Sequence, residues 1–333
     1  MGFNPPFPWR WVKTHPALIL LLALAHPAGA FELAPFKLSW PAACTLGDTC
    51  HIQQYPDRDP GPGATDFTCG PLSYDGHDGT DIALPDRAAM AAGVAVLAAA
   101  PGTVKGIRDG VADFAPKEDG KECGNGVVIQ HANGWETQYC HMRLGSVAVR
   151  PGDIVETGSK LGLIGQSGLA DFPHVHLSVR HNGQKVDPFA PGGDTCSPTL
   201  GPTLGPTLWA HPEPYEPGGF LSAGFTDAVP DFDTIRTGLP TLPLSATAPA
   251  IVIWAYVFGG RKGDVISLQI TEPQGQTLRQ DATLDRTQAQ LFRAYGKRLT
   301  AKTWPTGSYQ GLLILTRKGV AVDRMAISVT VGQ

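Results

Sequence analysis

The chain has 333 residues, a length that accommodates two domains. Hydrophobic residues make up 42% of the sequence and charged residues 17%, as is usual for a globular protein. The 40 glycines and 30 prolines favour turn-rich β structure over long helices. The formal net charge is −4 and the sequence has no basic run, which argues against nucleic acid as a partner.

The N-terminus has the pattern of an export signal. Arg10 and Lys13 precede the apolar run ALILLLALA at 17–25, and the tripeptide AGA ending at Ala30 fits a small-x-small cleavage site. The apolar run is shorter than the ~20 residues that a membrane-spanning helix requires. We therefore expect a signal peptide over residues 1–30, no transmembrane segment after its removal, and a mature protein in the periplasm or outside the cell.

Residues 31–70 are rich in Pro, Gly and Asp and predict an irregular segment pinned by disulfides. The chain has 6 cysteines, all beyond the signal, and an even number in an exported protein indicates disulfides. The short spacing of Cys44 and Cys50 suits a bridge that closes a small loop. Zinc ligation by these cysteines is disfavoured because no CxxC pair occurs.

Cys123 and Cys140 flank GNGVVIQHANGWETQY, a hairpin pattern whose turn is the ANG tripeptide at 132–134. We expect these two cysteines to be cross-strand partners. The remaining pair is then Cys69–Cys196, which would tie the entry of the region between them to its exit.

Residues 71–196 contain short β-type runs, most of them bounded by Gly, Asp or Pro. The runs are DIAL, AVLAA, GTVKGI, GVVIQHA, WETQYCHM, DIVETGSKLGLIG and HVHLSVR. Their length and spacing predict an antiparallel β domain.

Three short motifs in this region gather metal-binding residue types: His77 and Asp81 in GHDGTD, His141 in YCHM, and His174 with His176 in PHVH. Imidazole nitrogen and carboxylate oxygen suit a tetrahedral zinc ion. His174 and His176 are two apart on an expected strand, so both point to one face. A catalytic zinc ion commonly takes three protein ligands, which leaves two histidines for acid–base work or charge stabilisation. The sequence has no HExxH, which excludes the helical zinc site with its own glutamate base.

The segment SPTLGPTLGPTL at 197–208 repeats Pro-Thr-Leu and predicts an extended linker, because proline at every fourth position blocks a helix. Residues 209–333 then show alternating or apolar runs at sandwich-like spacing. AQLFRAYGKRL at 289–299 fits either a short helix or a strand with a bulge. WPTGSY resembles the closing turns of immunoglobulin-like modules, so we expect an immunoglobulin-like β-sandwich that acts as an accessory domain.

HDGTD, VVIQHANGWETQYCHM, PGDIVETGSKLGLIGQSG and PHVHLSVRHNGQKVDP resemble, in order, the lysostaphin/LytM-type zinc metallopeptidases over roughly residues 70–190. Many members of that family are murein endopeptidases. The resemblance implies that His77, Asp81 and His176 bind zinc, and that His141 and His174 are catalytic histidines that do not bind it. Ser178 stands where the family often has an acidic residue.

Together these features predict an all-β chain with an antiparallel, barrel-sandwich-like metallopeptidase domain. We expect an exported metalloendopeptidase with one zinc ion that hydrolyses peptide crosslinks or stem peptides of peptidoglycan, its partner in the cell wall. Which of the two non-ligand histidines is the base stays open. The alternatives are a non-catalytic wall-binding activator of another hydrolase, a barrel-sandwich carrier, and a secreted protease that acts on glycine-rich proteins. A carrier would need a modified lysine in a hairpin, and the nearest candidate turn, CHMRLG, has none.

Overall fold

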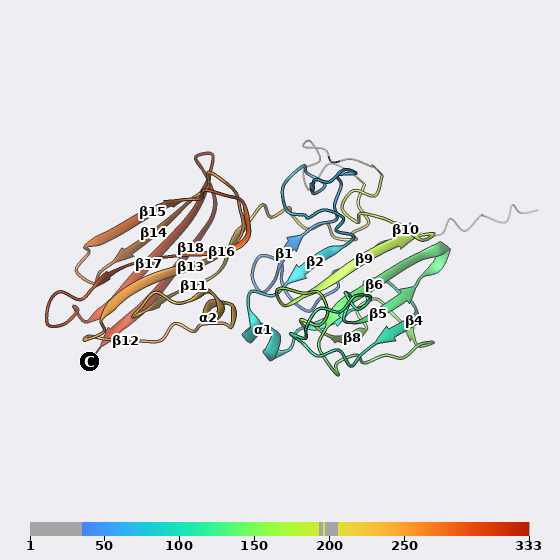
Figure 1. Ribbon diagram of the computed structural model, residues 1–333, viewed down its shortest axis with the longest axis horizontal. Helices are drawn as coiled ribbons and strands as arrows, with labels where there is room; N and C mark the ends of the chain where they lie inside the picture. The colour runs from blue at the N-terminus through green and yellow to red at the C-terminus, as the bar shows by residue number, and fades with distance from the viewer. Residues whose placement is uncertain (1–34, 193–195, 197–205, 333) are drawn as a thin grey trace, which may run out of the picture. The chain divides into compact units, whose positions relative to one another are not determined.

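The computed structural model describes residues 35–192, 196 and 206–332; the predicted signal peptide and most of the predicted linker lie outside the described residues. The described chain consists mostly of β-strands (Figure 1), in agreement with the all-β prediction. Within that part of the chain the helical elements are α1 (Arg87–Ala92), α2 (Phe232–Arg236) and a 3-10 turn (Ala132–Gly134). No helix among these residues is long and apolar enough to cross a membrane.

Strands β1 to β10 form the first part of the structure. They are β1 (His51–Gln54), β2 (Thr80–Ala83), β3 (Ala95–Leu97), β4 (Gly102–Arg108), β5 (Asn125–Gln130), β6 (Trp135–Met142), β7 (Ile154–Val155), β8 (Lys160–Leu163), β9 (His174–His181) and β10 (Gln184–Lys185). The main sheet has the order β1-β2-β9-β6-β5-β4-β7, with β10 beside β9, and β3 pairs with β8. Every one of these pairings is antiparallel, as the sequence predicts.

The pleat of β9 separates core from site. Val175, Leu177 and Val179 are at most 1% exposed and belong to the main hydrophobic cluster under the sheet. His174 and His176 alternate with them and therefore face the opposite side. Burial of three β-branched or leucine side chains on one face fixes the register, because a slip of one residue would exchange the two faces.

Two elements differ from the sequence prediction. Strand β1 lies inside the segment expected to be irregular, and it pairs with β2. Its sequence, HIQQ, shows no apolar alternation, although all four residues are buried. Helix α1 was not expected either; Asp86 caps it by accepting a hydrogen bond from the Ala89 N–H at 2.8 Å, and its alanine-rich sequence has a high intrinsic helix propensity.

Strands β11 to β18 form two further sheets. They are β11 (Gly219–Thr226), β12 (Leu244–Ser245), β13 (Ala250–Gly260), β14 (Val265–Thr271), β15 (Thr277–Thr283), β16 (Gln288–Arg298), β17 (Gly307–Arg317) and β18 (Val320–Gly332). One sheet has the order β11-β13-β16 and the other β12-β18-β17-β14-β15. Residues from both sheets share one hydrophobic cluster. The run that fitted either a helix or a strand is the strand β16.

The three disulfides are those predicted: Cys44–Cys50, Cys69–Cys196 and Cys123–Cys140. The hairpin between Cys123 and Cys140 also has the expected turn. Asn133 and Gly134 take positive φ values of 55° and 79°, a backbone conformation that Asn and Gly adopt most readily.

Residues 206–215 pack on the first part of the structure, although the sequence placed everything from 209 onward in the accessory domain. Leu208 and Trp209 belong to the main hydrophobic cluster, and Trp209 is 2% exposed. The Leu38 N–H donates to the Leu208 carbonyl, and the Ala210 N–H donates to the Leu38 carbonyl, both at 2.8 Å. Tyr215 packs against Tyr55 and Phe67. The first strand of the second part begins only at Gly219.

This packing predicts that Trp209→Ala destabilises the fold by ~3–5 kcal/mol, the usual cost of emptying a buried tryptophan site. Leu242→Ala, at an exposed side chain, is the matched control and should change the free energy of unfolding by less than about 0.5 kcal/mol. A chain ended after Pro217 should keep this contribution, and a chain ended after Ser197 should lose it. Denaturant unfolding measures the stability of the two substituted proteins and of the two truncated chains. Equal unfolding midpoints for the two truncated chains would contradict the prediction.

Candidate metal centre and its groove

The three predicted metal ligands converge at the junction of β2 and β9. Asp81 on β2 stands directly opposite His176 on β9 in the strand register. His77 precedes β2 in a turn closed by its own N–H, which donates to the Tyr74 carbonyl at 3.0 Å. Gly79 lies between His77 and Asp81 in the chain, at a position where an added Cβ atom would come within 2.4 Å of His176 Nε2. The GHDGTD motif therefore needs glycine at this position so that the histidine ring fits.

The ligand atoms lie at the separations that a tetrahedral ion requires. His77 Nε2 is 3.2 Å from Asp81 Oδ1 and 3.2 Å from His176 Nδ1, and His176 Nδ1 is 2.9 Å from Asp81 Oδ1. All three residues are buried. Metal–ligand bonds of about 2.0–2.1 Å at tetrahedral angles place ligand atoms about 3.3 Å apart. The donor set is thus nearly in place for one zinc ion.

The hydrogen bonds of the two rings leave lone pairs pointing inward. His77 Nδ1 lies 2.8 Å from the Tyr55 carbonyl oxygen and donates its proton there, so the neutral ring presents the lone pair of Nε2. His176 uses the opposite nitrogen, because its Nε2 contacts Asp78 Oδ1 at 3.2 Å and Ser178 Oγ at 3.0 Å. Two imidazole lone pairs and a carboxylate then face one another in a buried space. A cation between these donors would satisfy all three, so these residues fit a bound metal ion.

His141 and His174, the two predicted non-ligand histidines, lie beside the centre with ring centroids 4.5 Å apart. His141 Nδ1 donates to the Ser167 carbonyl and His174 Nδ1 to the Phe172 carbonyl, both at 2.8 Å. The Nε2 atom of His174 is 3.5 Å from Asp81 Oδ1. Each ring therefore keeps its Nε2 atom free of backbone contacts and available to other groups. The structure brings all five predicted residues together.

The two sets of histidines differ in their affinity for protons. Burial, together with the nearby His174 and His176, lowers the pKa of His141 well below its ordinary value. Burial also lowers the pKa of His174, with Asp81 as a partial offset. Burial acts in the same direction on His176, but hydrogen bonds to Asp78 and Asp81 outweigh it and raise that pKa to about 9. The non-ligand histidines are thus neutral near pH 7, whereas the carboxylates attract positive charge to His176.

Sequence reasoning missed Asp78, whose carboxylate contacts His176 Nε2 at 3.2 Å and so orients the ring. Its hydrogen bond with His176 and the nearby charges of Lys185 and Arg180 hold the pKa of the Asp78 carboxyl well below its usual range. Its other oxygen lies 3.8 Å from the Arg180 guanidinium. The signal was present in the sequence, because Asp78 follows His77 directly, but no spacing rule connects it with a histidine 98 residues later.

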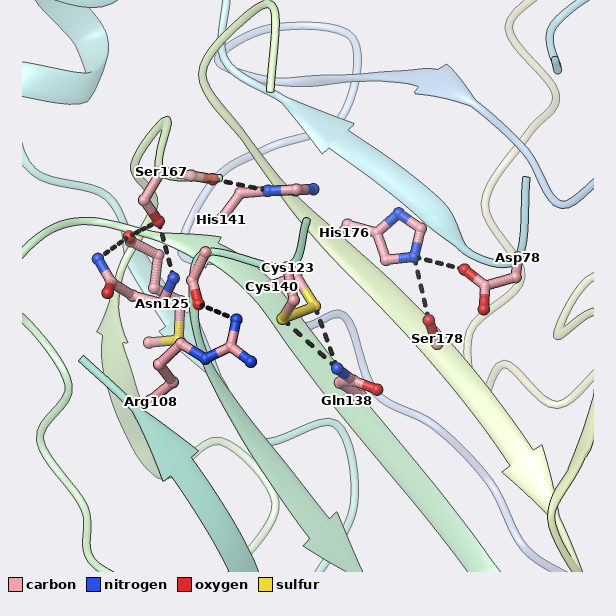
Figure 2. The surroundings of a disulfide bond; sticks show 12 residues. Asp78, Arg108, Cys123, Asn125, Gln138, Cys140, His141, Ser167, His176 and Ser178 are labelled. Carbon is pink, nitrogen blue, oxygen red and sulfur yellow. Dashed lines mark hydrogen bonds and ion pairs between the residues drawn. A yellow bond between two sulfur atoms is a disulfide. The ribbon is translucent and has the colours of Figure 1, made fainter. Parts of the chain in front are cut away.

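A groove of about 260 Å³ opens beside the metal centre. Its lining includes Tyr74, Asp78, Glu122, Cys123, Gln138, Cys140, His141, Leu169, His176, Ser178 and Arg180. Figure 2 shows part of this lining, with His141, His176 and the Cys123–Cys140 disulfide beside one another. Metal ligands, neutral histidines and a polar groove together suit hydrolysis of an extended peptide.

Comparison with known proteins agrees with this chemistry. The sequence profile described as Peptidase family M23 matches residues 75–188. The DD-carboxypeptidase/endopeptidase Mpg of Neisseria meningitidis serogroup B is 41% identical over 95 residues, which cover 27% of this chain and 20% of that protein. The peptidoglycan DD-endopeptidase ShyA of Vibrio cholerae is 32% identical over 111 residues, which cover 33% of this chain and 22% of that protein. The chain thus spans about a fifth of the length of these curated relatives.

Among solved structures, a mutant catalytic domain of the prophage-encoded M23 protein EnpA from Enterococcus faecalis is 27% identical, and the match covers 45% of this chain and 98% of that one with a TM-score of 0.32. The segment that the family profile matches, residues 75–188, contains all three motifs GHDGTD, YCHM and PHVH. Residues 75–188 of the chain are therefore a domain of Peptidase family M23.

Proposed function

We propose that the protein is an exported zinc metalloendopeptidase that hydrolyses peptide crosslinks or stem peptides of cell-wall peptidoglycan. The observation that carries the proposal is the convergence of three buried electron-pair donors next to two histidines whose pKa values are lowered. The names of the relatives, DD-endopeptidase and DD-carboxypeptidase/endopeptidase, support a peptidoglycan substrate.

In this proposal His77, Asp81 and His176 hold one zinc ion. Bound by these residues, the ion would supply Lewis-acid chemistry for the scissile carbonyl and would lower the pKa of water at the site toward ~7. Asp78 keeps the His176 ring in the orientation that directs Nδ1 inward. The groove positions the peptide across the centre.

His141 and His174 carry the proton transfers. Each is neutral near pH 7 and anchored through Nδ1, so Nε2 is the atom that accepts a proton from the attacking water. The protonated ring can then donate to the developing oxyanion or to the leaving amine. Their position on two different strands lets one histidine serve the water and the other the carbonyl oxygen.

Export is supported by the pattern of residues 1–30 and by the disulfides, which form and persist in oxidising compartments such as the periplasm. We propose that residues 1–30 are a cleaved signal peptide and that the enzyme works in the periplasm or outside the cell, where its substrate lies.

We further propose that the first part is barrel-sandwich-like and the accessory domain immunoglobulin-like. Two facing sheets with a shared core support the latter, as does the parallel pairing of β12 with the last strand. Tyr309, near the start of β17, donates from its hydroxyl to the Pro305 carbonyl at 3.1 Å, which resembles the tyrosine corner of such domains. A stabilising or spacing role fits this domain, because no metal-ligand cluster occurs among its described residues.

The ligand assignment predicts that His176→Ala loses its zinc, whereas His141→Ala and His174→Ala stay folded and keep about one ion per chain. The two zinc-loaded variants should be slower by ~10²–10⁴-fold, the usual effect of removing a positioned acid–base group. Metal analysis and peptide hydrolysis test this together. A His174→Ala protein without zinc beside a zinc-loaded His176→Ala protein would reverse the two roles.

The contact of Asp78 with His176 predicts that Asp78→Asn weakens zinc affinity by about 10- to 100-fold, as is typical when the partner of a metal-binding histidine is removed. Asp75→Asn is the matched control, since Asp75 is an exposed carboxylate of the same turn. Competition with a chelating dye measures both affinities. If the two variants bind zinc equally well, Asp78 does not support the ligand.

The proposed substrate predicts that the zinc-loaded protein releases soluble peptides from purified sacculi, and that a chelator stops the release until zinc is restored. Mass spectrometry of the products identifies the bond cut. A glycine-rich protein such as elastin, incubated in parallel, should stay intact. Its cleavage in place of the sacculi would favour the secreted-protease alternative, and cleavage of neither would favour the non-catalytic activator.

A further inference from the structure

The Cys123–Cys140 disulfide lies in the candidate active site, where the proposed chemistry gives it no role. Cys140 pairs directly with the metal ligand His176 across β6 and β9. Both cysteines line the groove, and the Gln138 amide group lies 3.4 Å from each sulfur atom (Figure 2). The next residue along β6 is His141.

His141 has a backbone conformation that needs support. Its φ of 62° lies in the left-handed region, which is unfavourable for a residue other than glycine. The Cys123 carbonyl accepts the His141 N–H at 2.8 Å, and the His141 carbonyl accepts the Gly165 N–H at 3.1 Å. One of the two hydrogen bonds that hold this backbone therefore comes from a residue of the disulfide.

The same segment also holds the His141 ring. The ring donates to the Ser167 carbonyl, and the Ser167 hydroxyl accepts the Asn125 N–H at 2.9 Å, two residues after Cys123. Gly124 packs so closely on Ser167 that an added Cβ atom would come within 2.4 Å of it. Displacement of residues 123–125 would thus disturb both the backbone and the ring of His141.

The metal ligands have anchors of their own outside residues 123–125. His77 is held on the Tyr55 carbonyl, and His176, besides its pairing with Cys140, is paired with Asp81 of β2. A change at residues 123–125 therefore separates the position of the non-ligand histidine from the binding of the metal.

We infer that the Cys123–Cys140 disulfide is a positioning device for His141. The covalent bond fixes the Cys123 segment to the strand that carries His141 and so keeps its Nε2 atom at the reacting centre. This role rests on the proposed peptidase function, and it goes beyond stabilisation because it acts on the rate through one named side chain.

The test is the double variant Cys123→Ala with Cys140→Ala, compared with the wild type and with Cys44→Ala with Cys50→Ala. The first pair should keep about one zinc ion per chain. Its kcat should fall by up to about 100-fold, the cost of a misplacement near 1 Å, with a smaller change in KM. Hydrogen exchange at the His141 amide should be faster than in the wild type. The control pair should keep the wild-type kcat and the wild-type exchange at His141.

A third variant separates positioning from loss of stability. His141→Ala added to the Cys123/Cys140 double variant should lower kcat little beyond His141→Ala alone, because both changes remove the same contribution. The inference would be overturned if the combined variant lost kcat by the product of the two separate factors. An unchanged kcat in the double variant, or unchanged hydrogen exchange at the His141 amide, would overturn it as well. If the alanine pair folds poorly, the corresponding serine pair supplies the same comparison.

Failure of the proposed function has a different signature. In that case the wild-type protein is folded, zinc-loaded and inert on sacculi, while the exchange at His141 still reports whether the disulfide holds this residue.

Discussion

Three electron-pair donors that point at one buried spot are the constraint on which the peptidase part of this molecule depends. His77, Asp81 and His176 place their ligand atoms 2.9–3.2 Å apart, and with their lone pairs inward they favour a positive charge between them. The register of β2 against β9 places two of the donors opposite each other, and a shift of either strand by one residue would turn its donor to the other face of the sheet. The buried apolar face of β9 therefore maintains the chemistry of its other face.

Three buried histidines of the site acquire two kinds of behaviour from their hydrogen-bond partners. His141 and His174 donate to backbone carbonyls, which hold the rings without adding a formal charge, so burial dominates and both pKa values fall. His176 lies against two carboxylates, and its pKa rises to about 9. Neutral backbone partners thus leave the buried rings of His141 and His174 uncharged near pH 7, so that each can accept a proton. The carboxylate partners of His176 instead make its surroundings attractive to a cation.

The sequence predicted those parts of the site that depend on local geometry. The two-residue spacing in PHVH is enough to place His174 and His176 on one face, and the ANG turn is enough to pair Cys123 with Cys140. Asp78 was missed because its role depends on a contact between a loop and a distant strand. Strand β1 was missed for a related reason, since HIQQ is buried by its neighbours and not by an apolar pattern of its own.

Residues 206–215 show the same limit and have a consequence for folding. Leu208 and Ala210 form hydrogen bonds with Leu38, about 170 positions earlier in the chain. The disulfide Cys69–Cys196 joins residues that are 127 positions apart. Contacts of such long range close slowly, because the entropy of the intervening loop must be lost first. The hydrophobic core of the peptidase part is therefore completed only when the chain beyond residue 209 is present. In a chain that crosses a membrane N-terminus first, this order would postpone an active hydrolase until almost two thirds of the polypeptide had passed through.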